Sequence, residues 1–386
     1  MAAIGIAACI VAVAVTLRSG THHEVVTEID RVRGLRRERV LASKQFHDGA
    51  FHNTRAVRDG LQPEGRGSVL REWMFGGQER RPPVALPVER PHEAWARGVE
   101  SGLRTTWLGH STVLLEIDGR RVLTDPVFAN RIGPGSLIGP RRFHPVPAQV
   151  SELPPLDVVL VSHDHFDHLC APTMRELART GVPIVTALGV GAHLEKYGFT
   201  AAQITELDWH ESAEVGGIRF TATPSQHFSG RSLGGRNKTL WASWVIAGER
   251  HKIFFSGDTG LTDEFAAIGT AHGPFDLVML EIGAFHPSWG TIHLGPENAL
   301  EAFTMLGSGT LMPVHWGTFS LGLHAWDAPG EELLELAPRY GARLVTPVLG
   351  APFEPAHVEG PQPWWRGLGQ DIVARGHWRK GAGGLT

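Results

Sequence analysis

The chain has 386 residues, a formal net charge of −4 with its histidines neutral, and only two cysteines, Cys9 and Cys170. A chain of this length can bury one large core or two ordinary ones, and two cysteines exclude a disulfide framework. The weak negative charge provides no field that would attract nucleic acid, so we expect no nucleic-acid partner. The 47 glycines and 26 prolines favour a loop-rich α/β enzyme over a helical bundle.

The chain begins with an uncharged run rich in alanine and valine, residues 2–17. This run has about the length of the apolar part of a signal peptide and is slightly short for a transmembrane helix. Arginines follow between residues 31 and 39, so a true span would leave the remaining chain cytoplasmic. We therefore expect a hydrophobic segment over residues 1–20 that is a membrane anchor, a signal or a frayed end.

Residues 21–101 follow as an arm that is rich in arginine and proline and contains isolated apolar residues. We expect this arm to drape irregularly over the main body. The apolar side chains expected to hold it there include Trp73, Met74, Phe75 and Trp95. A basic arm is also able to contact anionic lipid headgroups, and a solvated arm is the simpler alternative.

A β-rich pattern starts at residue 102. Residues 103–108, 113–117 and 121–124 favour three strands, and Asp118-Gly119 between the last two is a strong signal for a two-residue hairpin turn. Further strands are expected at 158–161, near 184 and 204, at 218–223, 241–247, 252–256 and 276–282, near 312 and at 344–347, and helices at 173–180, up to 198, at 296–306 and at 331–340.

Two β-rich halves with helices between their strands indicate how the main body is built. The pattern predicts an α/β fold in which two mixed sheets face each other and helices cover their outer faces, an αββα sandwich. We expect this sandwich to form the main domain over residues 102–355, followed by a C-terminal tail over residues 356–386.

One short predicted strand ends in a concentration of metal-binding side chains. Residues 158–161 are β-branched and aliphatic, as in a strand that is buried on both faces. Unpaired polar groups are costly to bury, and imidazole nitrogens and carboxylate oxygens are ligands that divalent metals such as zinc prefer. We therefore predict a metal site here and not a solvated loop. The candidate ligands in this loop are His163, His165, Asp167 and His168.

Three other predicted strands end in side chains of the same kind. His227, Asp258 and His315 each follow an apolar run within a few residues. A lone histidine after a strand is more often a hydrogen-bonded structural residue than a ligand. Because ligands that converge at one edge of a sandwich can complete two coordination shells, the four segments together predict a centre with two metals.

Six short motifs extend this pattern across the chain. They are Trp107-Leu108-Gly109-His110-Ser111-Thr112-Val113, Leu123-Thr124-Asp125-Pro126, His163-Asp164-His165-Phe166-Asp167-His168, Thr223-Pro224-Ser225-Gln226-His227, Phe255-Ser256-Gly257-Asp258-Thr259-Gly260 and His315-Trp316-Gly317-Thr318-Phe319. The set resembles the metallo-β-lactamase superfamily and, within it, the N-acyl-phosphatidylethanolamine-hydrolysing phospholipase D family. The resemblance extends over roughly residues 51–355.

The resemblance implies a dinuclear metal-dependent phosphodiesterase that cleaves N-acyl-phosphatidylethanolamine-type phospholipids to phosphatidic acid and an N-acylethanolamine. It also implies two zinc ions, with iron or manganese as alternatives. One metal would be held by His163, His165 and His227, and the other by Asp167, His168 and His315, with Asp258 bridging both. Asp167 and Asp258 would be catalytic residues because they hold the metals. His293 would act near the substrate, where a phosphate or headgroup contact and a structural role are both open.

Four further positions have specific expectations. Asp125 either hydrogen-bonds a ligand histidine or caps a turn, and His110 is expected to brace its loop rather than to bind metal. Cys170 is expected to be a small buried residue. Phe166 is expected to contact the substrate, and it departs from the mammalian-type pattern of the family, which has tyrosine at this position.

Several aromatic residues have two alternative interpretations. Those near the ligand segments either line an acyl-chain groove or pack in the core; they are Phe285, Trp289, Trp316 and Phe319. The pair Trp364-Trp365 either lies at a membrane interface or covers the contact between the tail and the body.

Other functions are weighed against the phospholipase. A lactonase or another small-molecule hydrolase would use the same fold, and a non-catalytic membrane-associated scaffold would not need the full ligand set. A nuclease is disfavoured because no dense strip of lysine and arginine accompanies the site. We expect a phospholipid and a membrane surface as partners, and a homodimer. We expect localisation at a membrane through the N-terminal segment, or otherwise in the cytoplasm.

Overall fold

The computed structural model describes residues 34–57, 66–232, 234–307, 309–366 and 368. The expected hydrophobic segment over residues 1–20 and the tail beyond residue 368 lie outside the described residues. Within the described ranges, no helix combines the length and the apolar character needed to cross a membrane.

The first sheet of the main body has seven strands in the order β15-β3-β4-β5-β6-β7-β8. Their bounds are β3 Leu103–Gly109, β4 Thr112–Ile117, β5 Arg120–Thr124, β6 Val158–Val161, β7 Ile184–Ala187, β8 Ile204–Leu207 and β15 Pro352–Phe353. Strands β3 to β5 are antiparallel and β5 to β8 are parallel. The predicted hairpin is confirmed, because Asp118 and Gly119 have φ values of 49° and 79°, as a type I′ turn requires.

The second sheet has six strands in the order β14-β13-β12-β11-β10-β9. Their bounds are β9 Ser212–Val215, β10 Ile218–Thr223, β11 Ser243–Ala247, β12 Lys252–Phe255, β13 Leu277–Glu281 and β14 Thr310–Val314. Strand β9 was not predicted, since it is a polar edge strand with no fully buried side chain. The strand predicted at 344–347 is wrong: only Leu344 forms a bridge there, with Leu311, and Thr346 hydrogen-bonds through its side chain to Gln362 instead of extending the sheet.

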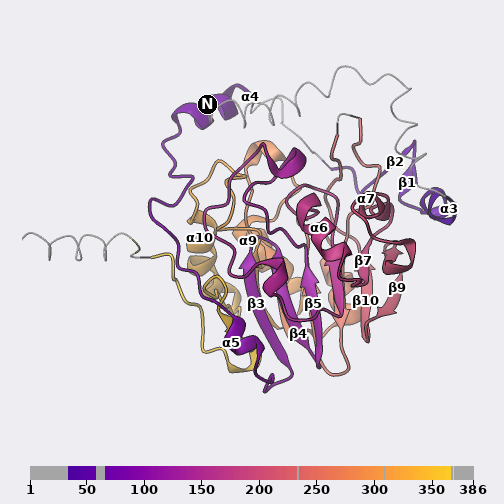
Figure 1. Ribbon diagram of the computed structural model, residues 1–386. Helices are drawn as coiled ribbons and strands as arrows, with labels where there is room; N and C mark the ends of the chain where they lie inside the picture. The colour runs from indigo at the N-terminus through magenta and orange to yellow at the C-terminus, as the bar shows by residue number, and fades with distance from the viewer. Residues whose placement is uncertain (1–33, 58–65, 233, 308, 367, 369–386) are drawn as a thin grey trace, which may run out of the picture.

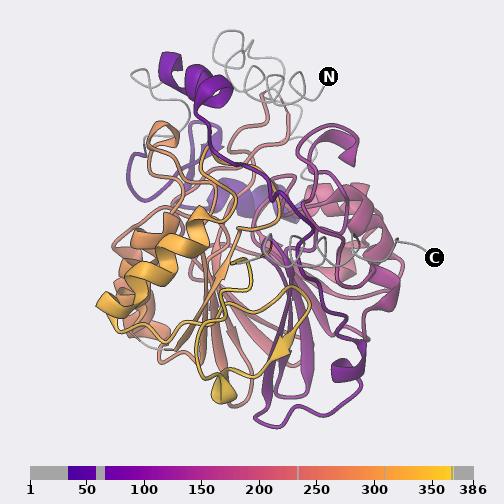
Figure 2. The same cartoon turned by 90° about the vertical axis from the view of Figure 1, so that its left-hand side faces the viewer.

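The two sheets face each other and helices cover their outer faces, which confirms the predicted αββα sandwich (Figures 1 and 2). Helices α6 Ala171–Ala178 and α7 Gly191–Lys196 flank the first sheet, and α8 Glu264–His272, α9 Gly295–Leu306 and α10 Ala328–Leu336 flank the second. Helix α8 was not predicted. Short 3₁₀ helices occupy Pro134–Ser136, Val150–Glu152, Ala201–Gln203, Pro287–Trp289, Ala337–Tyr340 and Pro355–His357. Fully buried side chains from both sheets, such as Leu115, Val159, Phe220 and Phe254, form one core between the layers.

The arm before residue 102 is more regular than expected. It contains α3 Leu35–Ala42, a hairpin of β1 Phe46–His47 and β2 Ala50–Phe51, α4 Arg66–Phe75 and α5 His92–Trp95. Trp95 is buried as expected, but Met74 and Phe75 are 51% and 76% exposed. These two residues therefore do not anchor the arm, and the fully buried Phe51 does so instead. Figures 1 and 2 both show α4 at the upper end of the molecule, which in Figure 1 is the end toward which β5 points.

Candidate metal centre

The loop after β6 carries its histidines into the interior of the sandwich. All four residues of β6 are buried, as predicted for a strand covered on both faces. After Ser162 the chain closes a tight turn, in which the His168 and Leu169 amides donate to the His165 carbonyl (3.1 and 2.8 Å). His163 and His168 are about 1% and 0% exposed. Polar rings so deeply buried need partners there.

We call His163, His165, His227 and Asp258 the first ligand group. His165 Nδ1 lies 2.9 Å from His163 Nε2 and 3.2 Å from His227 Nε2. Asp258 Oδ2 lies 3.8 Å from the first of these Nε2 atoms and 3.6 Å from the second. Ligands about 2.0–2.1 Å from a tetrahedral zinc ion stand roughly 3.3 Å apart, so these four atoms have a spacing suited to one metal.

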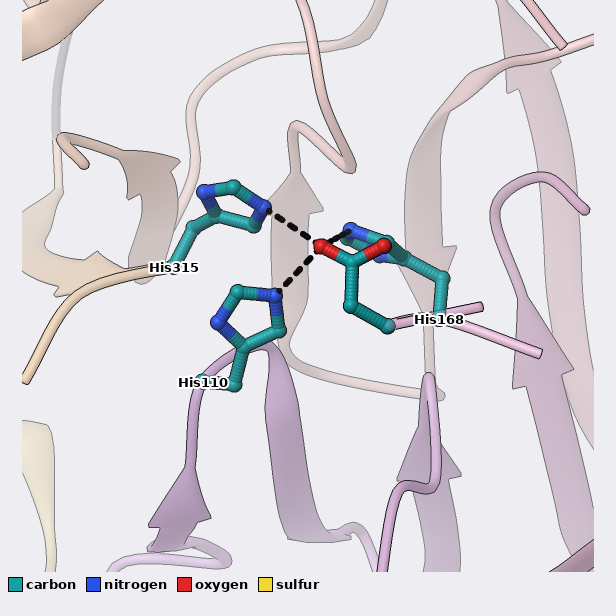
Figure 3. A group of neighbouring side chains, drawn as sticks. His110, His168 and His315 are labelled. Carbon is teal, nitrogen blue, oxygen red and sulfur yellow. Dashed lines mark hydrogen bonds and ion pairs between the residues drawn. The ribbon is translucent and has the colours of Figure 1, made fainter. Parts of the chain in front are cut away.

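We call His110, Asp167, His168 and His315 the second ligand group (Figure 3). Asp167 Oδ2 lies between the three rings, 3.1 Å from His110 Nε2, 3.6 Å from His168 Nε2 and 3.4 Å from His315 Nε2. Asp258 adjoins this group too, with Oδ1 3.2 Å from His168 Nε2 and Oδ2 3.2 Å from His315 Nε2. A single carboxylate thus contacts both groups, which is the arrangement expected of a bridging ligand.

Several atoms at the centre of the two groups are buried without any hydrogen-bond partner. They include His168 Nε2, His315 Nε2 and Asp258 Oδ1. An unpaired buried polar atom is costly, and bound cations at these ligand groups would satisfy such atoms. The residues therefore fit divalent metal ions, and the mixed nitrogen and oxygen donors suit zinc, iron or manganese.

Gly257 allows Asp258 to approach the ligand loop. Its φ is +55°, and a Cβ atom built on it would lie 2.7 Å from the Ser162 side chain. Only glycine combines this left-handed conformation with so close an approach. The Gly-Asp pair of the motif is thereby explained by packing between the two sheets.

Outer contacts fix the orientation of the rings. Asp125 accepts hydrogen bonds from the Ser162 amide and hydroxyl (both 2.7 Å) and from His168 Nδ1 (2.6 Å). The first of the two interpretations of Asp125 is therefore the one observed. His227 Nδ1 lies 3.0 Å from the Ile292 carbonyl. Such partners hold each ring with Nε2 on the side of Asp258, where it would be available to a metal.

Asn53 provides an outer contact that the sequence did not reveal. Its side chain accepts from the His227 amide (3.0 Å) and donates to the His227 carbonyl (2.8 Å). The arm therefore takes part in building the first ligand group. No motif marks this residue, because the contact depends on where the arm crosses the sandwich.

His110 differs from the sequence-based expectation. It does brace its loop, since its carbonyl accepts from the His315 amide (3.1 Å) and its amide donates to Thr318 Oγ1 (2.7 Å). Its ring, however, also lies in the second ligand group, 4.0 Å from the ring of His315. Burial, reinforced by the neighbouring His315, lowers the pKa of His110 to about 3. The neutral ring can therefore donate one hydrogen bond to Asp167.

The two ligand groups differ in the pKa values of their histidines. Burial lowers the pKa of His163 and His227 well below its usual value, so both rings are neutral. In the second group the neutral His110 is the exception; for His168 and His315 burial also disfavours the charged ring, but the nearby carboxylates outweigh burial. Asp258 and Asp167 raise the pKa of His168 well above normal and that of His315 to about 10.

Phe166 is not a free aromatic surface. The guanidinium of Arg231 lies 4.1 Å from its ring centroid and donates to the Leu169 carbonyl (2.9 Å) and the Asp164 carbonyl. The Gly230 amide donates to Asp164 Oδ1 (2.8 Å). These contacts connect the loop after His227 to the ligand loop. Nothing in the sequence of that glycine-rich loop distinguishes Arg231 from a solvated arginine.

His293 lies beside both ligand groups. Its ring centroid is 5.2 Å from that of His227 and 5.4 Å from that of His315, and its Nδ1 lies 2.8 Å from Glu281 Oε2. Burial opposes charge, but Glu281 raises the pKa of His293. Glu281 was not singled out from the sequence, although a lone acid at the end of an apolar strand was a usable signal.

Burial decides between the alternatives for Trp316, Phe319 and the tryptophan pair, whereas Phe285 and Trp289 are half-buried. Trp316 and Phe319 are 3% and 7% exposed and pack in the core. Trp365 is also buried and packs edge-on against Trp316 at 5.0 Å, so the tryptophan pair covers the contact between tail and body. Cys170 is a free, buried residue, as expected.

The sandwich and the two ligand groups define a metal-dependent hydrolase fold, and comparisons with known proteins identify the family. A model described as "Beta-lactamase superfamily domain" matches residues 120–316. The chain belongs to the metallo-β-lactamase superfamily and is a metal-dependent hydrolase of that fold. Among solved structures, the metallo hydrolase Igni18 from Ignicoccus hospitalis KIN4/I has a TM-score of 0.51 and 22% identity, covering 65% of this chain and 98% of its own.

Two kinds of relatives share more of the sequence. An uncharacterized protein of Mycobacterium tuberculosis is 44% identical over 329 residues, which cover 84% of this chain and 88% of the relative. N-acyl-phosphatidylethanolamine-hydrolyzing phospholipase D 1 of Caenorhabditis elegans is 38% identical over 250 residues, covering 61% of this chain and 70% of the relative. The mitochondrial enzyme of that name from Saccharomyces cerevisiae is 33% identical and has 53% of its length covered.

Proposed function

We propose that this protein hydrolyses N-acyl-phosphatidylethanolamine-type phospholipids to phosphatidic acid and an N-acylethanolamine, using two divalent metal ions. The observation that carries the proposal is the pair of buried ligand groups that share Asp258. The similarity to the nematode and yeast enzymes supports the choice of lipid.

Seven residues would hold the two metals in this proposal. They are His163, His165 and His227 for one metal, Asp167, His168 and His315 for the other, and Asp258 for both. Two bound metals supply positive charge for the phosphoryl oxygens and lower the pKa of a water molecule. Zinc suits this donor set best, with iron and manganese as alternatives.

The residues around the ligands keep this arrangement fixed during the reaction. Asp125 and the Ile292 carbonyl hold the Nδ1 atoms of His168 and His227, so neither ring can rotate away from its metal. His293 borders both groups and would contact the phosphate or the leaving headgroup. Phe166 would contribute only the ring face that Arg231 leaves free.

A membrane surface is the proposed source of the substrate. Six large apolar side chains among the described residues are more than half exposed. Two of them, Leu35 and Leu41, lie on α3. The other four lie on α4 and in the loop after β5; they are Met74, Phe75, Leu137 and Ile138, with exposures of 51%, 76%, 81% and 56%. Helix α4 lies at the end of the molecule to which β5 points (Figure 1), and exposed apolar side chains favour contact with lipid.

A lipid assay tests the proposal. Full-length protein is loaded with zinc, supplied with vesicles containing N-acyl-phosphatidylethanolamine, and the products are identified by mass spectrometry. We expect phosphatidic acid and N-acylethanolamine to form together, with none from the Asp258→Ala variant. Opening of a sugar lactone without any lipid cleavage would reject the phospholipase and favour the lactonase. Fewer than one tightly bound metal per chain would reject the dinuclear centre.

A further inference from the structure

Glu281 is a fully buried carboxylate at the metal centre that the proposed ligand set does not use. It is the last residue of β13 and is 0% exposed. Its Oε1 accepts a hydrogen bond from the Thr259 amide (2.7 Å), and its Oε2 accepts one from His293 Nδ1 (2.8 Å). Oε2 also lies 3.7 Å from His315 Nδ1. One side chain thus connects the backbone after Asp258 to two histidines.

A buried carboxylate at this position calls for an explanation. A charged group is costly to remove from water unless it is paired. The Thr259 amide needs only one neutral acceptor, which an amide side chain would provide. The second oxygen, Oε2, and the negative charge of Glu281 interact with His293 and His315. The contact with His293 is the shorter of the two. His293 is therefore the residue that explains why an acid is required here.

The contact with Glu281 determines how His293 faces the metal centre. A carboxylate only accepts hydrogen bonds. His293 must therefore carry a proton on Nδ1, the ring nitrogen that faces Glu281. Nε2 is then the ring nitrogen left for a group bound at the metals. Because the ring borders both His227 and His315, a fixed orientation keeps Nε2 in one position relative to both ligand groups.

We infer that Glu281 is a positioning residue that orients His293 for hydrolysis, an inference that rests on the proposed function. An opposing assignment is that Glu281 binds metal itself. Asp258, Glu281, His293 and His315 do offer ligand atoms within 4.8 Å of one another. The two assignments differ in what the loss of the Glu281 charge does to metal content.

The test uses Glu281→Gln, His293→Ala and the double variant. Glutamine has the same shape but only one acceptor atom, so it cannot serve both the Thr259 amide and His293 Nδ1. We expect Glu281→Gln to lower kcat by about tenfold to a hundredfold with KM and two metals per chain retained. In the His293→Ala background the same substitution should change kcat by no more than about twofold.

Asp118→Asn is the matched control. Asp118, in the hairpin between β4 and β5, also pairs with a histidine, His251, at 2.7 Å, but this pair lies outside both ligand groups. We expect its loss to leave kcat and metal content unchanged. A reduced metal content in Glu281→Gln would instead make Glu281 a ligand, and equal losses in both backgrounds would mean that it does not act through His293. Either result overturns the inference.

A proton resonance provides a readout that does not depend on activity. In the zinc-loaded protein, a ring proton held between His293 Nδ1 and Glu281 should give a downfield signal that is absent in His293→Ala and shifted in Glu281→Gln. Its absence from the wild type overturns the inference even if Glu281→Gln fails to fold. Kinetics are measured on the lipid and on bis(p-nitrophenyl) phosphate. A wild type that cleaves only the second would reject the lipid assignment and leave the test of Glu281 intact.

Discussion

Each ligand group takes two residues from the loop after β6, and the groups share Asp258, yet they differ in the pKa values of their histidines. In the first group, His163, His165 and His227 bring only neutral rings to the metal position. In the second group, carboxylates adjoin the rings and raise the pKa of His168 and His315. Without metal, the first group is already in the state that binds metal, whereas the second holds protons in place of metal.

This difference indicates that the two metals should not bind equivalently. A ligand histidine must be neutral to bind, so metal binding at a protonated site releases protons. Metal binding to the first group displaces no protons from its histidines. At the second group, the metal must compete with the protons on His168 and His315. We therefore expect stepwise loading, with the first group filled before the second near neutral pH.

Removal of Asp258 should have the largest effect, because it is the residue common to both groups. We expect Asp258→Ala to lower turnover by about 10²–10³-fold or more and to reduce metal content in both groups, with circular dichroism close to wild type. Metal analysis and the lipid assay measure this. Asp263→Ala, which removes an exposed acid, is the control. Loss of only one metal would show that Asp258 does not bridge.

The pH dependence of metal binding tests the difference in charge. The raised pKa values mean that His168 and His315 hold protons at pH 7 in the metal-free protein, so lowering the pH should weaken the second group. Each proton released corresponds to about tenfold in affinity per pH unit. Zinc titration calorimetry at pH 6, 7 and 8, in buffers of different ionisation enthalpy, should find proton release mainly in the weaker step. Equal proton release in both steps would contradict the distinction.

His110 should matter to the second group alone. Its ring contacts Asp167 and His315 but none of the residues of the first group. We expect His110→Gln to weaken the second metal by about tenfold, the usual value of a hydrogen bond to a charged group, and to leave the first unchanged. Competition with a chromogenic chelator measures both steps. A weaker first metal would mean that His110 acts on the whole loop and not through Asp167.

The ligands were predictable from the sequence because each follows a strand that is apolar enough to recognise. His163, His227, Asp258 and His315 all lie just beyond buried strands, and strand ends at one edge of a sandwich must meet. The sandwich itself followed from the same apolar runs. Strand β9 was not predicted because an edge strand does not need continuous apolar residues.

Apart from Asp125, the supporting residues were not predicted, for a different physical reason. Asn53, Arg231 and Glu281 each act through a pair of hydrogen bonds, which span 12 to 174 positions of chain. Such contacts depend on the path of loops and not on a local pattern. Sequence periodicity carries no information about them, so the geometry of the folded chain was needed to find the groups that orient the ligands.

Substitution of Arg231 should have the smallest effect on the two ligand groups. Arg231 contacts the loop after β6, which supplies ligands to both groups. Its guanidinium contacts the carbonyls of Asp164 and Leu169 and covers Phe166. Arg231→Met would remove these bonds but keep the Gly230–Asp164 contact, so we expect metal affinity to fall in both groups by only about threefold to tenfold. Arg236→Met is the control, because Arg236 is an exposed arginine of the same loop that lies 4.3 Å from the ring of Phe228. A fall confined to one group would mean that the ligand loop is two independent halves, each held by its own strand, and that its shared position contributes little to the difference between the metals.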